Sequence, residues 1–277
     1  MGYRVASTFP RVLTCVVLCA LSSFASAAHR IISLSPHATE LAFAAGLGSQ
    51  LVGVSQASDY PPAAKHIERV ANFKGINVDR IIALQPDLII SWPEGNPPKV
   101  IAQLKNMGFN VYPASIKHLD DIAEHIRHLS HYASHPQTGL NNAKQFMEQL
   151  NALRQRYQDA SPVRYFYQIS AKPLITMAKD SWPSAVFTLC GGVNVFASSP
   201  SPYPQVGLEQ VLLAQPQVMF SAHPNAMQLW DNWQNELSAF QHHHVWTLNA
   251  DWLNRATPRT LNAVEQVCKY LDRVRKD

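Results

Sequence analysis

Charged residues are scarce in this sequence. Only 15% of the 277 residues are Asp, Glu, Lys or Arg, against roughly 25% in a typical soluble domain, so a disordered or highly charged tail protein is excluded. The net charge of +4 is weak and scattered, which argues against a nucleic-acid-binding protein. Hydrophobic residues make up 47%. At roughly 100–200 residues per domain, the length predicts two compact units.

Long apolar runs are missing outside the N-terminus, so the body of the protein is not expected to span a membrane. Residues 1–27 have the three parts of a secretory signal. Arg4 and Arg11 supply the positive start, residues 12–24 the apolar stretch, and residues 25–27 the small side chains of a cleavage site. An uncleaved membrane anchor is the alternative. Removing the two arginines with this segment lowers the net charge from +4 to +2, so the exported chain is nearly neutral.

Cysteines are few, and two of the four lie within the signal segment. Its removal leaves Cys190 and Cys268, an even pair in an oxidising compartment, which predicts a disulfide bond. Two buried free thiols are the alternative. A catalytic cysteine is less favoured, because a reactive thiol rarely persists unpaired after export.

Several catalytic motifs are also missing. The sequence has no Gly-x-Ser-x-Gly nucleophile elbow, no P-loop and no His-Glu-x-x-His zinc motif. Its twelve histidines nevertheless raise the alternative of a secreted metal-dependent hydrolase or a metal receptor. We expect those on the helix from Lys117 to lie on its solvated side, opposite an apolar stripe, and we expect no functional metal site. The histidines concerned are His118, His125, His128, His131 and His135, besides His242, His243 and His244 further on.

The rest of the chain alternates short β-rich runs with helical runs. This order predicts parallel strands joined by crossover helices, and therefore an α/β fold. In the first half we expect strands at residues 30–34, 51–55, 87–91 and 109–113, and helices at 38–45, 78–84 and 97–107. In the second half we expect strands at 163–169, 217–221 and 245–248, and helices at 208–214, 226–239 and 259–273.

One segment of the first half recurs in the second. Residues 79–88 align without gaps to residues 209–218, and each copy has a helical run that stops at Gln-Pro before an apolar strand. The proline ring blocks further helical hydrogen bonding at that point. We interpret the recurrence as evidence of two related lobes. A common type of helix–proline–strand junction is the alternative.

A long helix is predicted between the two lobes. Residues 137–158 place apolar side chains at spacings of three and four, and a helix of about 20 residues spans about 30 Å. The expected organisation is a signal peptide at 1–27, an N-terminal α/β lobe at 28–135, a connecting helix at 136–160 and a C-terminal α/β lobe at 161–277. A cleft between such lobes, near the carboxyl ends of strands, is the usual place for a ligand.

Several segments of this chain together resemble those of one family. Residues 32–46, ISLSPHATELAFAAG, closely resemble the opening of periplasmic cobalamin-binding proteins. The match continues in order at residues 52–55, 58–62, 83–89 and 251–259. Haem and siderophore receptors of the same long-helix class share the Ser-Pro and Pro-Asp-Leu segments. The combination looks like the vitamin B12 receptor of an ABC importer.

The resemblance implies a class III periplasmic binding protein, with two α/β lobes joined by a single long α-helix. It further implies cobalamin as transported ligand, no catalysis, no cofactor and a periplasmic location. The expected partners are the permease and ATPase subunits of the importer, and the chain is expected to be a monomer. A haem or ferric-siderophore receptor of the same class is the alternative.

The resemblance also places a set of residues toward the ligand. Aromatic side chains suit the flat corrin, and Asp251 and Arg255 suit its amides or phosphate through charge-assisted hydrogen bonds. The alternatives are lobe-edge core packing for the aromatics and an internal salt bridge for the charged pair. His37 is expected to be a neutral hydrogen-bonding group, with cobalt ligation as the alternative. The predicted ligand-facing residues are Pro36, His37, Trp92, Tyr203, Asp251, Trp252, Leu253, Asn254 and Arg255.

Three positions depart from well-known members of the resembled family. Ala57 stands where an aromatic residue often contacts the corrin, and Phe73 and Tyr203 stand where tryptophans can occur. Two acidic residues match the positions that the family uses for docking to the permease: Glu68 in the first lobe and Glu209 in the second. Ordinary surface glutamates are the alternative for this pair.

Overall fold

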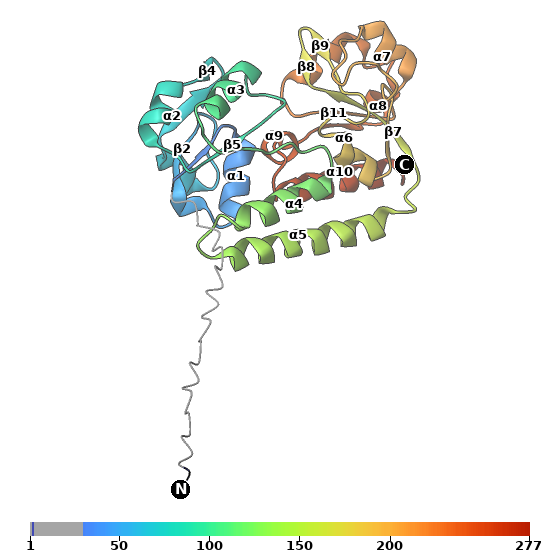
Figure 1. Ribbon diagram of the computed structural model, residues 1–277. Helices are drawn as coiled ribbons and strands as arrows, with labels where there is room; N and C mark the ends of the chain where they lie inside the picture. The colour runs from blue at the N-terminus through green and yellow to red at the C-terminus, as the bar shows by residue number, and fades with distance from the viewer. Residues whose placement is uncertain (1, 3–29) are drawn as a thin grey trace.

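The structure is a computed structural model that describes Gly2 and residues 30–277. The predicted signal segment, apart from Gly2, lies outside the described residues. Two α/β lobes stand side by side on a layer formed by helices α4 (Leu119–Ser130) and α5 (Pro136–Tyr157) (Figure 1). Among the described residues, no helix combines the length and apolar character that crossing a membrane requires.

The N-terminal lobe contains a six-stranded sheet in the order β4-β3-β2-β1-β5-β6, parallel except for the β3–β4 pair. The central strand β1 is fully buried because it is covered on both faces and on both edges. The strands are β1 (Ile31–Ser33), β2 (Leu51–Ser55), β3 (Arg69–Asn72), β4 (Gly75–Ile76), β5 (Leu88–Ser91) and β6 (Val111–Pro113).

Helix α1 begins as the sequence predicts. The Ser35 side chain accepts a hydrogen bond from the amide of Ala38 at 3.3 Å, and Pro36 occupies the first helical position. Gly46, at φ +88°, follows the end of the helix. The helices of this half are α1 (Pro36–Ala44), α2 (Val78–Leu84), α3 (Pro98–Asn106) and α4 (Leu119–Ser130), with short 3-10 helices η1 (Gly48–Gln50) and η2 (Pro62–His66).

The C-terminal lobe contains a parallel four-stranded sheet in the order β10-β7-β11-β12. Its strands are β7 (Val163–Gln168), β10 (Gly192–Asn194), β11 (Val218–Ser221) and β12 (Val245–Thr247), with a small hairpin of β8 (Ser170–Ala171) and β9 (Leu174–Ile175). Its helices are α6 (Ser184–Leu189), α7 (Leu208–Ala214), η3 (Ala226–Trp233), α8 (Ser238–Gln241), α9 (Ala250–Asn254) and α10 (Thr260–Val274).

The recurring sequence segment has the same structure in both lobes. Helices α2 and α7 both end in a left-handed glutamine, Gln85 at φ 44° and Gln215 at φ 41°, directly before the proline. Strands β5 and β11 then begin three residues after these glutamines. The proline forbids further helix, and the left-handed turn redirects the chain into the sheet.

An arginine fixes each of these junctions in the same way. The backbone amide of Arg30 donates to Asp87 at 2.9 Å, and that of Arg164 donates to Gln217 at 2.8 Å. The guanidinium of each arginine donates to the carbonyl of the last residue of its helix, α2 or α7. The same contacts therefore recur at this helix–strand junction in both lobes, and the relatedness of the lobes as a whole stays a prediction.

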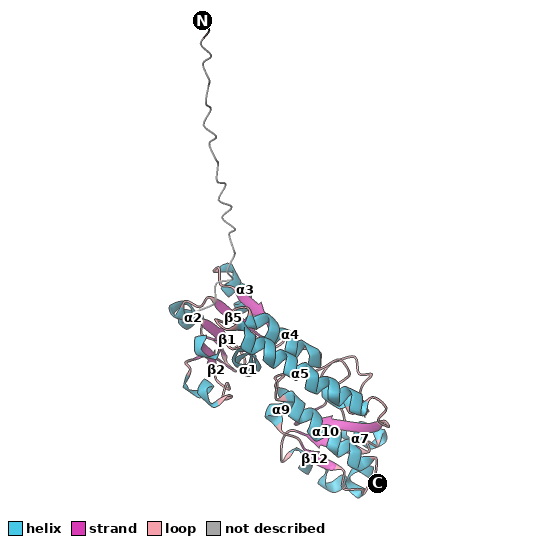
Figure 2. Cartoon of the chain, turned by 90° about the horizontal axis from the view of Figure 1, so that it is seen from below, coloured by secondary structure: helices cyan, strands magenta, loops and turns pink. Residues whose placement is uncertain are grey.

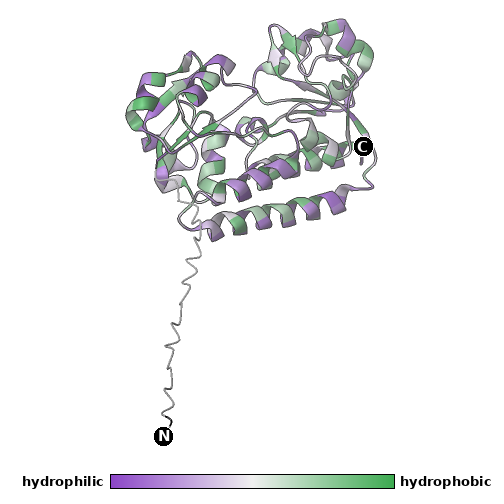
Figure 3. Cartoon of the chain, in the orientation of Figure 1, coloured by the Kyte–Doolittle hydropathy of each residue, from purple (hydrophilic) through white to green (hydrophobic). Residues whose placement is uncertain are grey.

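Helix α5 (Pro136–Tyr157) runs beneath both lobes, side by side with α4 (Figures 1 and 2). Polar and apolar residues alternate along both helices (Figure 3), and the apolar face of α5 buries Ala143, Phe146 and Leu150. A Cβ atom on Gly139 would lie 2.5 Å from the Cβ of Ser130, so this glycine lets the two helices approach closely. One continuous apolar core extends from β1 through α5 to α10.

Two features differ from the predictions. The expected helix at 226–239 is wrong, because the segment forms the 3-10 helix η3, a break, and then α8. Trp230 is drawn into the core, where its Nε1 donates to Gln168 at 2.7 Å, and the asparagines of this segment have low helix propensity. The sequence prediction also missed the short elements β3, β4, β8, β9, β10, α6 and α9. The exact lobe boundaries at residues 135 and 160 stay predictions.

The predicted disulfide is confirmed. Cys190, at the end of α6, is bonded to Cys268 in α10, and both side chains are fully buried. The bond therefore joins a short helix to the closing helix of the C-terminal lobe, across 78 residues of sequence.

We expect the Cys190→Ala/Cys268→Ala variant to lose about 2–5 kcal/mol of unfolding free energy, because the bond closes a long loop in the unfolded chain. Denaturant titration of wild type and variant measures this loss. Wild-type protein whose disulfide is reduced before the titration should have the same free energy of unfolding as the variant. Equal stability of the oxidised wild type and the variant would contradict the expectation, as would complete alkylation of both thiols without reductant.

Candidate functional site

Each sheet has a point at which the chain changes direction from one neighbouring strand to the other. In the N-terminal lobe this point lies between β1 and β5, and in the C-terminal lobe it lies between β7 and β11. Ligands of open α/β sheets bind outside the carboxyl ends of strands at such points. His37 follows β1, Trp92 follows β5, Ile169 follows β7 and His223 follows β11, and all four line one cavity.

This cavity, which we call the interlobe cleft, has a volume of about 780 Å³. Both lobes contribute to it, and so does the segment between β6 and α4. Its aromatic walls are Trp92, Tyr167, Trp182 and Tyr203, and its polar lining includes Glu94, Lys117, Asp180 and Asn254.

A second cavity of about 510 Å³ adjoins the cleft on the N-terminal lobe. Trp92 lines both cavities, so its side chain forms a wall that the two share. Pro36, Ala57 and Phe73 also line the second cavity, and Phe73 is 89% exposed on the β3–β4 turn.

His37 and Trp92 form the wall of the N-terminal lobe. Their rings meet edge to face, with centroids 5.3 Å apart. Burial lowers the pKa of His37 to about 4, and a hydrogen bond to the backbone of Ala114 offsets only part of that effect. The imidazole is therefore neutral at physiological pH, as predicted.

Hydrogen bonds assemble the facing wall of the C-terminal lobe. The Tyr203 hydroxyl donates to the carbonyl of Trp182 at 3.0 Å, and Trp182 Nε1 donates to the carbonyl of Leu253 at 2.9 Å. The Tyr167 hydroxyl donates to Asn254 Oδ1 at 3.1 Å. Helix α9 thus anchors the side chains of Trp182 and Tyr167, and Trp182 in turn holds Tyr203 through its backbone. Tyr203 remains 48% exposed to the cleft, and partial burial raises the pKa of its phenol.

Asp251 of α9 and Arg255, which directly follows this helix, belong to an ion-pair group that we call the Glu40 cluster. Glu40, only 4% exposed, accepts from Arg259 at 2.6 and 2.8 Å, and Arg255 lies 3.4 Å from the same carboxylate. Arg255 also pairs with Asp59 at 2.6 Å and with Asp251 at 3.1 Å. The hydrogen bond from Arg255 lowers the pKa of Asp59. The cluster joins the lobes, since Glu40 and Asp59 belong to one and the arginines to the other.

The structure thus brings together only part of the predicted ligand set. His37, Trp92, Tyr203 and Asn254 line the interlobe cleft, and Pro36 lines the adjoining cavity. Leu253 is fully buried, and Trp252 packs against the core. Asp251 and Arg255 form the internal ion pairs described above. Direct ligand contact of each predicted residue stays a prediction.

Sequence reasoning missed Trp182, Glu94 and His223, which also line the cleft. A signal for Trp182 was present, because it precedes Pro183 just as Trp92 precedes Pro93. A residue before proline is disfavoured in a helix, so a tryptophan at such a position is a candidate to project its ring from a loop.

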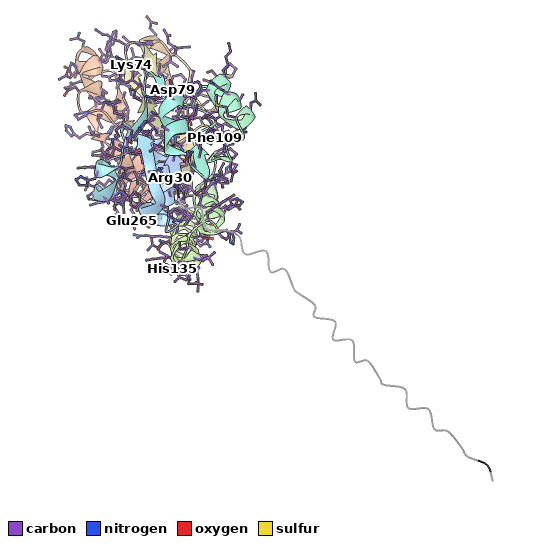
Figure 4. All side chains as sticks on the ribbon, turned by 60° about the vertical axis from the view of Figure 1, so that its left-hand side comes forward. Arg30, Lys74, Asp79, Phe109, His135 and Glu265 are labelled. Atoms are coloured by element: carbon purple, nitrogen blue, oxygen red, sulfur yellow. A yellow bond between two sulfur atoms is a disulfide. The ribbon has the colours of Figure 1, made fainter. Side chains whose placement is uncertain are left out.

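The two predicted docking glutamates are both exposed. Glu68 forms a bidentate ion pair with Arg80 of α2, which lowers the pKa of Glu68, while Glu209 lies in the first turn of α7. Helices α2 and α7 lie on the side of the lobes away from α5 (Figure 1). Figure 4 shows Asp79 of α2 and His135, next to α5, at widely separated levels of the molecule.

The histidines of α4 lie only partly as predicted. His118, His128, His131 and His135 are exposed, but the prediction of a solvated side chain is wrong for His125. That residue is partly buried, hydrogen-bonds the Tyr112 hydroxyl and lies 2.8 Å from the Ser115 carbonyl. Among residues 30–277, no three His, Cys, Asp or Glu side chains are grouped so that they could hold a metal ion.

Two lobes on a long helix, with a cavity between the carboxyl ends of their strands, define a solute-binding protein. Residues 31–251 match the family described as periplasmic binding protein. The chain belongs to this family. Among its relatives, the vitamin B12-binding protein of Vibrio cholerae serotype O1 is 58% identical over 246 residues, 88% of this chain and 89% of the relative. The vitamin B12-binding protein of Yersinia pestis is 43% identical over 266 residues, 95% and 93% of the two chains.

Solved structures agree with this assignment. The periplasmic vitamin B12 binding protein BtuF of Vibrio cholerae superposes with a TM-score of 0.87 at 56% identity, covering 91% of this chain and 99% of that one. The haem-binding protein BhuT superposes with a TM-score of 0.76 at 21% identity, covering 88% and 98%. At that identity the second likeness concerns the fold alone.

His37 predicts a specific pH dependence of stability. Its pKa falls from 6.5 to about 4 on folding, so the unfolded chain binds more protons between these values. Stability contributed by neutral His37 is therefore present above about pH 6.5 and is lost as the pH falls toward 4. We expect a loss of at most about 3 kcal/mol from this group.

Denaturant titrations of wild type and His37→Gln at several pH values measure this contribution. The variant should lose less stability than the wild type across the window, since glutamine does not titrate. Parallel losses in the two proteins, or an NMR titration of His37 near pH 6.5, would contradict the expectation.

Proposed function

We propose that this protein captures cobalamin, vitamin B12, in the interlobe cleft and delivers it to the permease of an ABC importer. The observation that carries the proposal is an aromatic-walled cleft between two lobes, in a chain 58% identical to a vitamin B12-binding protein. The same proposal includes export to the periplasm after removal of residues 1–27, and action as a monomer without a cofactor of its own.

The chemistry of cobalamin suits this cleft. The corrin is large, flat and fringed with amides, and it carries little net charge. Trp92 and Tyr203 offer partly exposed ring faces from opposite lobes, and aromatic faces pack well against flat apolar surfaces. The side chains of Glu94, Lys117 and Asp180 nearly balance in charge, which favours a nearly neutral ligand.

Haem and ferric siderophores are the competing ligands. A neutral His37 supplies a nitrogen that suits the iron of haem as well as cobalt, so the protonation state alone does not discriminate between them. The 58% identity to a vitamin B12-binding protein favours cobalamin, and haemin is therefore the most informative control ligand.

Calorimetric titration of the oxidised mature chain tests the proposal. We expect one cyanocobalamin per chain, with heat released on binding and protection against thermal unfolding by mass action. Haemin and a ferric siderophore serve as controls in the same buffer. The proposal is overturned if cyanocobalamin gives neither signal while haemin gives both.

The exposed glutamates give a second expectation, for delivery. Replacing Glu68 and Glu209 together with Ala should leave cobalamin affinity unchanged, because neither lines the cleft. It should weaken receptor-dependent ATPase stimulation and uptake several-fold, because paired carboxylates orient the encounter with a basic partner surface.

Uptake into liposomes containing the cognate transporter measures this effect. Glu148→Ala is the matched control, since Glu148 is also exposed and ion-paired, with Lys144, but lies on α5 away from α2 and α7. Normal transport by the double variant would refute docking through these glutamates. An equal loss in the control would show an effect of net charge alone.

A further inference from the structure

The orientation of Trp92 needs an explanation, because this side chain is 38% exposed and is not held by the apolar core. Its indole nevertheless forms part of two cavities at once. An exposed aromatic ring that must present one face to a ligand loses affinity if it samples several orientations. We therefore looked for contacts near Trp92 in the sequence that hold its indole in one orientation.

The backbone of Trp92 is held by the four residues that follow it. The carbonyl of Trp92 accepts from the amides of Gly95 at 3.2 Å and Asn96 at 2.8 Å, and the amide of Trp92 donates to Asn96 Oδ1 at 2.7 Å. Asn96 is almost fully buried, and its Nδ2 donates to the carbonyl of Leu34 at 3.0 Å. The turn is thereby attached to the carboxyl end of β1, beside His37.

The ring itself lies against Gly95. A Cβ atom on this residue would lie 2.0 Å from Cε3 and Cζ3 of Trp92, which no real side chain tolerates. The backbone of Gly95 has no positive φ that would demand glycine. Its lack of a side chain therefore serves the close approach of the indole rather than the conformation of the turn.

We propose that Gly95 and Asn96 are positioning residues that fix the Trp92 indole as the wall shared by the two cavities, and so set ligand affinity. Asn96 places the backbone, and Gly95 lets the ring approach the turn closely. The His37 and Trp92 rings meet edge to face, with centroids 5.3 Å apart. The inference rests on the proposed function for its ligand. The part of the inference that concerns the fixed orientation of the Trp92 ring does not depend on the ligand.

A double-mutant cycle tests the inference. Gly95→Ala should weaken cyanocobalamin binding about tenfold, since displacing one stacked aromatic face removes an interaction of that order. In a Trp92→Leu background the same substitution should change affinity less than twofold, because leucine lacks the ring atoms that the new Cβ would meet. Gly207→Ala is the matched control: its Cβ would have only ordinary contacts, the nearest at 3.6 Å, and affinity should stay unchanged.

A ligand-free measurement separates this inference from the proposed function. Subtracting the emission spectrum of a Trp92→Leu protein from that of its Trp92 counterpart gives the contribution of Trp92. In Gly95→Ala this contribution should shift to the longer wavelengths of a solvent-exposed tryptophan. Asn96→Asp keeps the acceptor for the Trp92 amide but loses the donor to the Leu34 carbonyl. It should therefore shift the Trp92 emission less than Asn96→Ala does.

The outcomes are distinct. If wild type binds no cyanocobalamin, the proposed function fails, and the fluorescence result alone decides the positioning of Trp92. If wild type binds but Gly95→Ala weakens binding equally in both backgrounds, the effect does not pass through Trp92 and the inference is overturned. An unchanged Trp92 spectrum in both Gly95→Ala and Asn96→Ala also overturns it.

Discussion

The arrangement of the two lobes depends on one buried carboxylate. Glu40 is almost completely removed from solvent, and a buried charge is costly unless it is paired and hydrogen-bonded. Its partners, Arg255 and Arg259, come from the opposite lobe. Glu40 is therefore satisfied only while the lobes keep their present spacing, and Arg259 adds a stacking contact 4.0 Å above the ring of Tyr60. Helix α5 fixes the lobes at their base, and the Glu40 cluster fixes them between their sheets.

A chain of buried hydroxyl groups ties this contact to the cleft. Thr39 lies 2.6 Å from Ser33 and 2.7 Å from Ser58, and Ser58 lies 2.9 Å from Ser55. These residues belong to the ends of β1 and β2, to α1, and to the loop that carries Asp59 and Tyr60. The loop that meets the opposite lobe is thus positioned by the same strand ends that form the ligand site. Fully satisfied buried networks of this kind specify one arrangement.

Features with a local cause were predictable from the sequence. The Ser35-Pro36 start of α1, the Gln-Pro ends of α2 and α7, and the Cys190–Cys268 bond each follow from neighbouring residues or from compartment. Features decided by distant contacts were not. The break in residues 226–239 follows the burial of Trp230 beside Gln168, and the pairing of Arg255 with Glu40 joins residues 215 positions apart. Position His125 was missed for the same reason, because its partners lie outside α4.

The two lobes share a fold unit but build their ligand walls differently. The repeat that aligns Ser91 with Ser221 places Ala222 where the first lobe has Trp92, so the second lobe must supply its aromatics from elsewhere. Trp182 and Tyr203 come from loops. The Trp182 indole donates to the carbonyl of Leu253 in α9, and the Tyr203 hydroxyl donates to the carbonyl of Trp182. That short helix also carries Asp251 and immediately precedes Arg255 of the Glu40 cluster.

The wall of the first lobe is therefore set within its own turn, by a glycine and an asparagine. The wall of the second lobe is set by a helix that also holds the lobes together. Arg255 directly follows α9, so one short segment carries a residue of the Glu40 cluster and the carbonyl that accepts from Trp182. Residues 250–255 therefore belong both to the contact between the lobes and to the aromatic wall of the second lobe. The first lobe has no such overlap, because the anchors of Trp92 include none of the charged residues that join the lobes.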